Sequence, residues 1–440
     1  MNRLIYRLLW LNHMLRQWLR KQMTPAGFGL LGALFVFGLI GLDIKRSISY
    51  QIFVFLLATL LVSFLLSRFG RYRFSVVRKL PRFGTVGSPL KYQVVINNKS
   101  RNQRQGLSLI ESFADTFPTF QAFRRLVRKS KTRQDWIGRM AQRRWAFAPA
   151  IELPPLSAQG ETTVPGEIVP LRRGVLRFKK LTLACPEPLG LVNRCVSFTR
   201  PQSVLILPRR YELPTITLPG ARRQQSEGLA LASSVGDSEE FRALREYRPG
   251  DSPRKIHWKS WAKLGKPVIR EEQTEYSVRH ALILDTFQAE DYSEVMEEAV
   301  AIAASLACTV QTQESLLDLV FVSGEAHSFT VGRGLGQTEQ LLELLASVVP
   351  CQDQGFESLL PVVRSRLSLL SGCICVFLAW DDDRKALIEQ LQSAGVPVLV
   401  LIIAPDAGLA ATPDTSCLTD KQSSLHVLTV DTIQAGLLAL

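Results

Sequence analysis

Two groups of carboxylates follow apolar segments in the C-terminal half of the sequence. Asp285 ends the apolar run 280–285, and three aspartates, Asp381 to Asp383, follow the apolar run 373–380. If both runs are strands of one parallel sheet, their carboxyl ends meet at the edge where open α/β sheets bind ligands. Oxygen ligands of this kind suit a divalent cation. Asp285 and Asp381 are therefore the candidate ligands of a metal site.

The residues after Asp285 argue against a metal. Phe287 and Ala289 offer no side-chain oxygen, whereas a hard cation takes about six oxygen ligands. The competing interpretation is that Asp285 caps a turn. We therefore expect no bound cofactor, and a divalent-metal-dependent enzyme or ligand-binding domain using Asp285 and Asp381 is the alternative.

A second candidate site is the segment 240–273, which combines many charges with aromatic rings. It contains nine Lys/Arg, together with Tyr247, His257, Trp258 and Trp261. His257 lies in a dense cluster of charges and would suit a general base. No nucleophile stands at a recognisable spacing from it, and no GxxxxGK[ST] run marks a nucleotide site. The sequence therefore predicts no catalytic residues.

The local pattern of this segment predicts a short helix between a turn and a strand. Ser252 would cap the helix, with Pro253 at its first position, where the missing N–H costs nothing. The helix would end near Leu264, before a left-handed Gly265. Residues 248–251 predict a turn before the helix, and residues 267–270 predict a strand after it.

Three interpretations of this segment compete: a solvated helix with its aromatic rings in the core, a nucleic-acid site, and a structural ion-pair cluster. Basic residues on phosphate with aromatic rings on bases would bind single strands, and this option ranks last. We favour a structural clasp that joins the basic half of the chain to the acidic half. Trp258 and Trp261 would anchor one helix face by burial. Arg245 and Arg254 would pair with carboxylates such as Glu246 or Asp251, or with those of the acidic half.

The charge is unevenly distributed along the 440 residues, whose net charge is +14. Residues 1–82 contain 13 Lys/Arg and one acid, and residues 83–280 contain 34 basic and 17 acidic residues. Residues 281–440 contain 6 basic and 21 acidic residues. Internal docking between basic and acidic surfaces explains much of this asymmetry without nucleic acid. The seven cysteines are odd in number and form no CxxC pair, which indicates reduced thiols.

Two uncharged apolar runs predict a membrane helical hairpin within residues 1–73. Residues 26–42 and 48–66 are each about long enough to cross a bilayer as a helix. Cations precede the first run and follow the second, whereas the linking loop has two. The positive-inside bias therefore predicts that both termini are cytoplasmic. Residues 1–22 would form an amphipathic helix in the membrane interface.

Period-two patterns predict an antiparallel β-sandwich over residues 74–210. Its strands are expected at 90–96, 107–110, 161–168, 175–183 and 204–207. Residues 113–149 interrupt this pattern as a basic insertion, with nine Lys/Arg and one acid between Arg124 and Arg144. The insertion would form one or two basic amphipathic helices on anionic lipid, or else a solvated loop. Residues 211–237 are polar and predict a linker.

Alternating strands and helices predict an α/β domain with a parallel sheet in residues 238–440. The expected strands are 280–285, 316–322, 373–380, 397–403 and 425–430, and the expected helices are 295–310, 338–348 and 385–394. This alternation is typical of right-handed βαβ units with helices on both faces of the sheet.

The run RALREYRPGDSPRKIHWKSWAKLGKPVIRE resembles the signature of the bacterial family of domain of unknown function 58. The candidate site residues within it are Arg245, Glu246, Tyr247, Pro249, Gly250, Asp251, Arg254, His257 and Trp258. The order of segments also resembles this family, whose last domain is von Willebrand A-like. The resemblance implies a multi-pass protein of the bacterial inner membrane. It also implies two partners, a MoxR-type AAA+ ATPase and a transglutaminase-like membrane protein.

Two departures from the family pattern are visible. Von Willebrand A domains hold a cation through an Asp-x-Ser-x-Ser loop, and here Phe287 and Ala289 replace both hydroxyl ligands. In the turn before Leu191, Glu187 stands where the family commonly has Asp, and we expect the turn to survive because it depends more on Gly190. Together these features favour a membrane-anchored adaptor or scaffold, bound to a lipid bilayer and not to nucleic acid.

Overall fold

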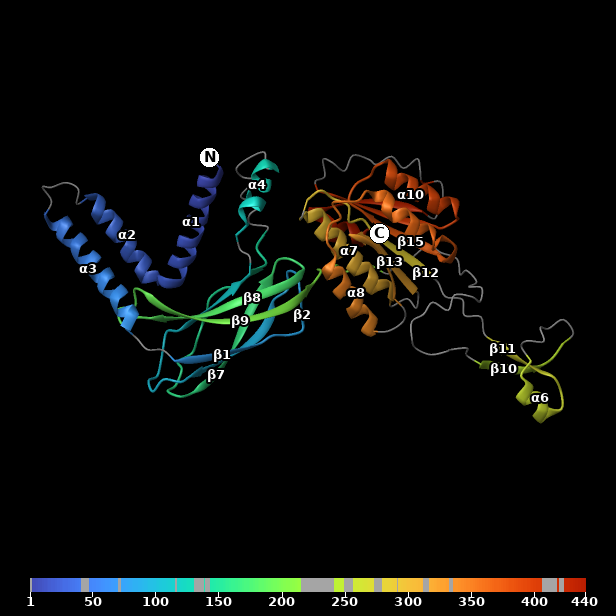
Figure 1. Ribbon diagram of the computed structural model, residues 1–440, viewed down its shortest axis with the longest axis horizontal. Helices are drawn as coiled ribbons and strands as arrows, with labels where there is room; N and C mark the ends of the chain where they lie inside the picture. The colour runs from blue at the N-terminus through green and yellow to red at the C-terminus, as the bar shows by residue number, and fades with distance from the viewer. Residues whose placement is uncertain are drawn as a thin grey trace. The chain divides into compact units, whose positions relative to one another are not determined.

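The computed structural model describes residues 2–40, 47–69, 73–114, 117–129, 138, 143–214, 241–248, 256–272, 279–290, 292–311, 316–331, 335–405, 418 and 423–440. The chain divides into two compact units (Figure 1). Unit 1 contains Met1–Arg209 with Glu343–Ser347, and unit 2 contains Arg210–Leu342 with Val348–Leu440.

Three helices begin unit 1: α1 (Asn2–Gln22), α2 (Pro25–Ile40) and α3 (Ser47–Phe69). Within the described residues, one stretch is long and apolar enough to cross a membrane, Ile48–Arg68 in α3. The second predicted span is not supported, because α2 has 16 residues, about 24 Å of helix. The two helices pack together, and a Cβ on Gly38 would come within 3.3 Å of the Phe53 ring.

Two sheets pack face to face in unit 1, with the strand orders β1-β3-β7-β5 and β2-β9-β8-β4-β6. Residues such as Val94 and Ile96 of the first sheet share one buried core with Phe178 and Leu183 of the second. The expected antiparallel sandwich is present, except that the short β2 pairs with β9 in parallel. The strands are β1 (Phe74–Lys79), β2 (Phe83–Thr85), β3 (Leu90–Asn98), β4 (Ser108–Phe113), β5 (Ala146–Phe147), β6 (Ile151–Glu152), β7 (Glu161–Pro170), β8 (Gly174–Pro186) and β9 (Asn193–Leu207).

The basic insertion contains one described helix, α4 (Phe120–Lys129), before β5 returns to the first sheet. The side chain of Phe123 in α4 is buried. Most of residues 130–142 lie outside the described residues, so the possible second helix of the insertion stays a prediction.

The N-terminal helices α1 to α3 contact the end of the sandwich at the turn between β8 and β9 through hydrogen bonds. The backbone amide of Thr24 donates to the Leu191 carbonyl at 3.2 Å. A Cβ on Gly27 would lie 2.1 Å from the same carbonyl oxygen, so a side chain there would collide with backbone. Arg194 donates to the carbonyl of Arg68, near the end of α3, at 2.8 Å. The start of α2 and the end of α3 therefore meet the same end of the sandwich.

The turn between β8 and β9 survives, as expected, with Gly190 at a φ of 70°. Its Glu187 side chain contributes more than the sequence argument assumed. This buried carboxylate accepts hydrogen bonds from the backbone amides of Leu189 at 2.6 Å, Leu191 at 2.9 Å and Val192 at 3.4 Å. Glu187 thus satisfies three amides of the turn.

Unit 2 contains a six-stranded sheet with the order β14-β13-β12-β15-β16-β17. All neighbours pair in parallel except β13 and β14, which form an antiparallel edge that the sequence analysis did not predict. The strands are β12 (Arg279–Leu284), β13 (Leu316–Ser323), β14 (Glu325–Val331), β15 (Gly372–Phe377), β16 (Val398–Ala404) and β17 (Ser424–Thr429). The sheet is thus mixed, with a parallel centre.

Helices cover both faces of this sheet, as predicted. One face packs against η2 (Phe356–Leu359), α9 (Leu360–Arg364) and α10 (Asp382–Ser393). The alternate residues of the strands are also buried, and α7 (Glu294–Gln311) contacts four of these strands. The remaining helical elements of unit 2 are η3 (Leu367–Leu369), η4 (Val430–Thr432), α11 (Ile433–Leu438) and the first part of α8 (Leu335–Ser347), whose last five residues belong to unit 1.

A separate two-stranded sheet carries the signature segment. It pairs β10 (Phe241–Glu246) with β11 (Val268–Glu272) in antiparallel fashion, and α6 (Trp258–Leu264) lies between them in the sequence. The strand after the helix was predicted, whereas β10 was not. The helix begins at Trp258, since Ile256 forms an antiparallel bridge with Ile269. The predicted cap at Ser252 and first position at Pro253 lie outside the described residues. Its end at Leu264 and the left-handed Gly265, with a φ of 68°, agree with prediction.

Candidate functional site

The two metal candidates lie at the point where the strand order of the six-stranded sheet reverses. Asp285 directly follows β12, and Asp381 follows β15 and caps α10. These strands are neighbours, and the chain connects outward from them in opposite directions. In open α/β sheets this switch point is the usual place for a ligand. The sequence therefore correctly placed both aspartates at the carboxyl-end edge of the sheet.

Arg384 occupies the space between these two carboxylates. Its Nε lies 2.7 Å and its Nη2 2.6 Å from Oδ2 of Asp285, and its Nη1 pairs with Asp381. The guanidinium also lies 4.7 Å from the centroid of the Phe356 ring. The Arg384 side chain is 6% exposed and that of Asp285 is fully buried. A positive charge of the protein therefore stands where a cation ligated by these aspartates would lie.

The remaining acceptor capacity of Asp285 is used by backbone amides. Phe287 donates to Oδ1 and Leu378 donates to Oδ2, both at 3.0 Å. Burial raises the pKa of Asp285 above its usual range, while Arg384 and these amides oppose that rise. The bond from Phe287 is the turn-capping role that the sequence offered as the alternative to metal binding. Among the described residues, no group of three or more His, Cys, Asp or Glu is placed to hold a metal ion.

The described part of the signature segment is held together by its backbone. Tyr247 donates its amide to the Pro267 carbonyl at 2.9 Å. Arg245 donates to the carbonyl of Glu246 at 3.2 Å, and the Glu246 carboxylate forms an exposed ion pair with Lys266 at 3.3 Å. Four candidate residues, Pro249, Gly250, Asp251 and Arg254, lie outside the described residues, so their pairing stays a prediction.

His257 caps α6. Its Nδ1 accepts from the Ser260 amide at 3.3 Å and lies 2.8 Å from the Ser260 hydroxyl. The sequence assigned the cap to Ser252 and considered His257 as a general base. In the structure the Nδ1 atom of the imidazole satisfies an amide of the first helical turn.

The two tryptophans of the signature stack on each other at the surface. The ring centroids of Trp258 and Trp261 are 5.2 Å apart with planes at 21°, and Trp258 is 65% exposed. No residue of α6 is buried. The prediction that these rings anchor the helix by burial is therefore wrong. The apolar contacts of this segment come from Val268 and Ile269 of β11, which are buried.

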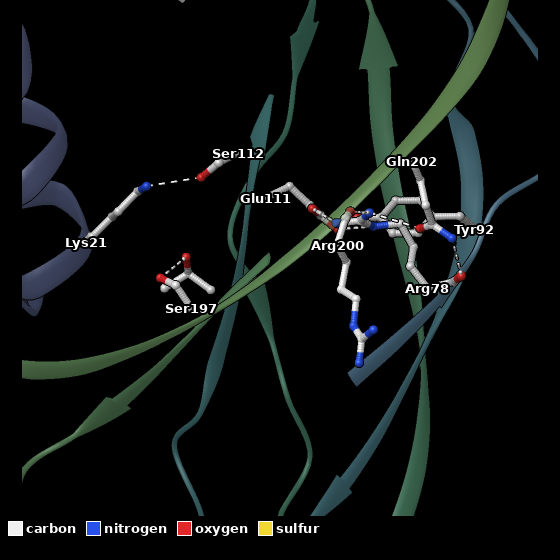
Figure 2. Close-up of polar contacts among 9 residues, drawn as sticks. Lys21, Arg78, Tyr92, Glu111, Ser112, Ser197, Arg200 and Gln202 are labelled. Atoms are coloured by element: carbon white, nitrogen blue, oxygen red, sulfur yellow. Dashed lines mark hydrogen bonds and ion pairs between the residues drawn. The ribbon is translucent and has the colours of Figure 1, made fainter. Parts of the chain in front are cut away.

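Arg384 and two further buried ion pairs were not predicted from the sequence. In unit 2, Arg279 binds Asp318 through two bonds of 2.8 and 3.0 Å. In unit 1, Arg78 binds Glu111 at 2.6 and 3.0 Å, inside the sandwich (Figure 2). In these two pairs the arginine lies 39 and 33 residues from its carboxylate, so the sequence spacing gave no signal. For Arg384, the signal was its position three residues after Asp381, one helical turn away.

The Arg78–Glu111 pair is part of a larger buried polar group. Tyr92 donates to Glu111 at 3.2 Å, and Arg78 donates to the Gln202 side chain at 3.1 Å (Figure 2). Burial raises the pKa of Glu111 and of Tyr92. The group joins strands of both sheets, so we interpret it as a structural cross-link of the sandwich.

Residues 243–368 match a family model described as "Protein of unknown function DUF58". This match supports the resemblance that the signature carries. The DUF58-matched segment contains Asp285 but ends before Asp381 and Arg384. Only one side of the switch-point site therefore lies within the match.

A curated relative and a solved structure give further likenesses. "Uncharacterized protein YeaD" of Bacillus subtilis (strain 168) is 23% identical over 188 residues, 42% of this chain and 45% of the relative. The match thus spans less than half of that relative. The CARDB domain of PF1109 from Pyrococcus furiosus, in a solution NMR structure, is 12% identical and covers 31% of this chain and 94% of that domain. Its TM-score of 0.17 is too low to assign a fold.

Proposed function

We propose that this protein is a membrane-anchored adaptor and not an enzyme. The observation that carries the proposal is the position of Arg384. Its guanidinium pairs with Asp285 and Asp381, so the switch-point site presents neither an open coordination position nor a free carboxylate pair. A catalytic metal needs such an open position. Unit 2 would therefore act by binding a partner protein at its surface.

We further propose that α2 and α3 together enter the membrane as a hairpin. α1 lies on the same side of the membrane as the sandwich, because Lys21 donates to Ser112 of β4 (Figure 2). Tyr6 of α1 also donates to the Pro118 carbonyl of the basic insertion. The end of α3 returns to the sandwich through Arg194. If α3 crosses the bilayer, α2 must carry the chain to the far side first. This geometry supports two passes although α2 is short.

The strand order supports a von Willebrand A-like assignment for unit 2. Such a sheet combines a parallel centre with one antiparallel edge strand, and β14 has that place here. On this proposal, the chain sits in a bacterial inner membrane with both termini in the cytoplasm. Its partners there are a MoxR-type AAA+ ATPase and a transglutaminase-like membrane protein.

The exposed Trp258–Trp261 pair is our proposed contact for the ATPase. Aromatic side chains at a surface are enriched among the residues that dominate binding energy. The experiment is co-purification from native membranes after cross-linking, with the wild-type chain beside Trp258→Ala. We expect a MoxR-type ATPase with the wild type and at least tenfold less with the variant. Equal recovery would contradict this contact, and no ATPase with either chain would contradict the adaptor proposal.

Metal analysis of the purified full chain tests the enzymatic alternative. The adaptor proposal expects no stoichiometric Mg²⁺ or Mn²⁺ and no change in bound metal on Asp285→Ala. One equivalent of metal, lost on that substitution, would contradict the adaptor proposal and support a metal-dependent activity. Salt-dependent binding to single-stranded DNA would instead favour a nucleic-acid role.

A further inference from the structure

α1 and α4 pack together although they are far apart in the sequence. The Tyr6 ring lies 5.7 Å from the Phe117 ring, 5.4 Å from the Phe120 ring and 5.3 Å from the Phe123 ring, measured between centroids. His13 lies 5.1 Å from Phe117. The aromatic face of α1 is therefore covered by the basic insertion.

The opposite face of α1 is apolar and is exposed in the described part of the chain. Five residues spaced alternately by four and three positions form one row along the helix: Leu4, Leu8, Leu11, Leu15 and Trp18. Their exposures are 68, 59, 59, 52 and 43%. At about 100° per residue, this row lies roughly half a turn away from Tyr6 and His13. The packing on α4 therefore leaves the row free.

The two helices carry charge of a single sign. Together their sequences contain nine Lys/Arg and no Asp or Glu. Arg124 and Arg128 of α4 are exposed, and Arg3 of α1 lies 5.6 Å from the Phe120 ring centroid, beside the contact between the helices. An apolar row flanked by cations is the pattern of a helix that lies in a lipid interface.

We propose that α1 and α4 form one composite surface that binds an anionic phospholipid bilayer. This proposal rests on the membrane attachment proposed above and names the lipid class that the attachment prefers. The leucine row enters the acyl boundary while the cations of both helices contact head groups. α1 ends at Gln22 and α2 begins at Pro25, so α1 directly precedes the proposed membrane helices in the chain. On this proposal the insertion at 113–149 contributes α4 to a lipid-binding surface that it shares with the N-terminal helix α1.

The charge of α1 and α4 distinguishes between two binding partners for the apolar row, a lipid bilayer and a second copy of this chain. Two copies joined through α1 would bring two sets of the same cations together, without an acid in either helix. Repulsion between these two sets of like charges opposes association of the two copies. An anionic bilayer instead attracts every one of these cations. The apolar row therefore fits anionic lipid better than it fits itself.

The test uses the full chain reconstituted into vesicles, with photoreactive benzoylphenylalanine in place of Leu11. In phosphatidylcholine vesicles with about one third phosphatidylglycerol, we expect phospholipid adducts. Because each cation contributes substantially to binding an anionic surface, we expect about tenfold fewer adducts in pure phosphatidylcholine. The charge reversal Arg124→Glu/Arg128→Glu should lower the yield similarly. Lys91→Glu/Lys179→Glu, on exposed sandwich positions, is the matched control and should change it less than twofold.

Each other outcome overturns the proposal. Adducts to a second copy of the chain assign the row to dimerisation, and equal yields in both vesicle types remove the role of anionic lipid. Alkaline extraction separates the lipid contact of α1 and α4 from the membrane attachment on which it rests. A chain that stays in the membrane but gives no lipid adduct refutes this inference alone, whereas a chain released by alkali refutes the membrane attachment itself.

Discussion

Arg384 neutralises a carboxylate that is otherwise sealed from water. Removing one partner of a buried ion pair costs about 3–5 kcal/mol, because the other charge stays behind. We therefore expect Arg384→Ala to lower the free energy of opening of β12 by about that amount, measured by hydrogen–deuterium exchange. The neighbouring Lys385→Ala is the control, since Lys385 is 3.9 Å from a fully exposed Asp382 carboxylate and should change stability by less than about 0.5 kcal/mol. Equal effects would contradict a buried role for Arg384.

His280 is a buried imidazole in the centre of the sheet, and neither ring nitrogen has a hydrogen-bond partner among the residues that the structure describes. Burial lowers its pKa to about 4 from 6.5. Its folded pKa is depressed, so stability is complete above pH 6.5 and is lost as the pH falls towards 4. At pH 5 the loss is about 2 kcal/mol. His280→Leu should remove this pH dependence of β12 exchange, and an unchanged difference between pH 7.5 and pH 5 would refute the assignment.

Trp258 separates a structural role of the signature from a binding role. Its ring is exposed, so Trp258→Ala should change the thermal midpoint little, by less than about 0.5 kcal/mol in stability. Val268→Ala is the comparison, because that side chain is buried and its truncation should cost on the order of 1–3 kcal/mol. A large loss of stability with Trp258→Ala would restore the structural clasp in which the ring is buried.

The junction of α1 and α2 makes a prediction at the level of elements. Gly27→Ala places a Cβ into the Leu191 carbonyl, and overlap of this kind typically costs about 1–3 kcal/mol. We expect at least tenfold faster exchange of the Thr24 amide, which donates to that carbonyl. Gly29→Ala is the matched control in the same helix, since its Cβ meets nothing within 4 Å. Equal exchange in both variants would show that the junction is loose.

The elements that the sequence predicted are those with a local signal. Continuous apolar runs located β12, β15 and β16 to within a few residues, because buried parallel strands are apolar on both faces. The antiparallel β14 was missed because its run, EAHSFTV, alternates weakly and carries a charge. The helix start at Trp258 was missed because the sequence pattern does not predict the bridge of Ile256 to Ile269 in β11. Tertiary pairing decided both cases.

The residues of the candidate site also fall into those that the sequence predicted and those that only the fold reveals. Asp285 and Asp381 were found because the carboxyl ends of adjacent parallel strands meet, which follows from topology alone. Arg384 was not found, because its position one turn after Asp381 indicates only the contact within the helix, whereas its contact with the distant Asp285 needs the fold. The composite surface of α1 and α4 was likewise predicted only as two separate helices. Contacts between segments more than a hundred residues apart need the fold.

At the scale of the whole molecule, the number of membrane passes decides where the two ends lie. A single pass through α3 would put the N-terminus and unit 2 on opposite sides of the bilayer. That arrangement would break the contact of Lys21 with Ser112 of the sandwich and that of Tyr6 with Pro118 of the basic insertion, both at 3.1 Å. Two passes keep these contacts, and the cations before α2 and after α3 favour the same side.

We therefore expect both termini to be cytoplasmic. A reporter active only outside the cytoplasm should stay silent when fused before Met1 and when fused after Leu440. The control fusion, in the segment between α2 and α3, should be active because that segment would face the other side. Activity at one terminus alone would establish a single pass and would require α1 to leave the sandwich. In that case exchange at the Thr24 amide should be fast in the wild-type chain as well, which provides an independent check on the reporter.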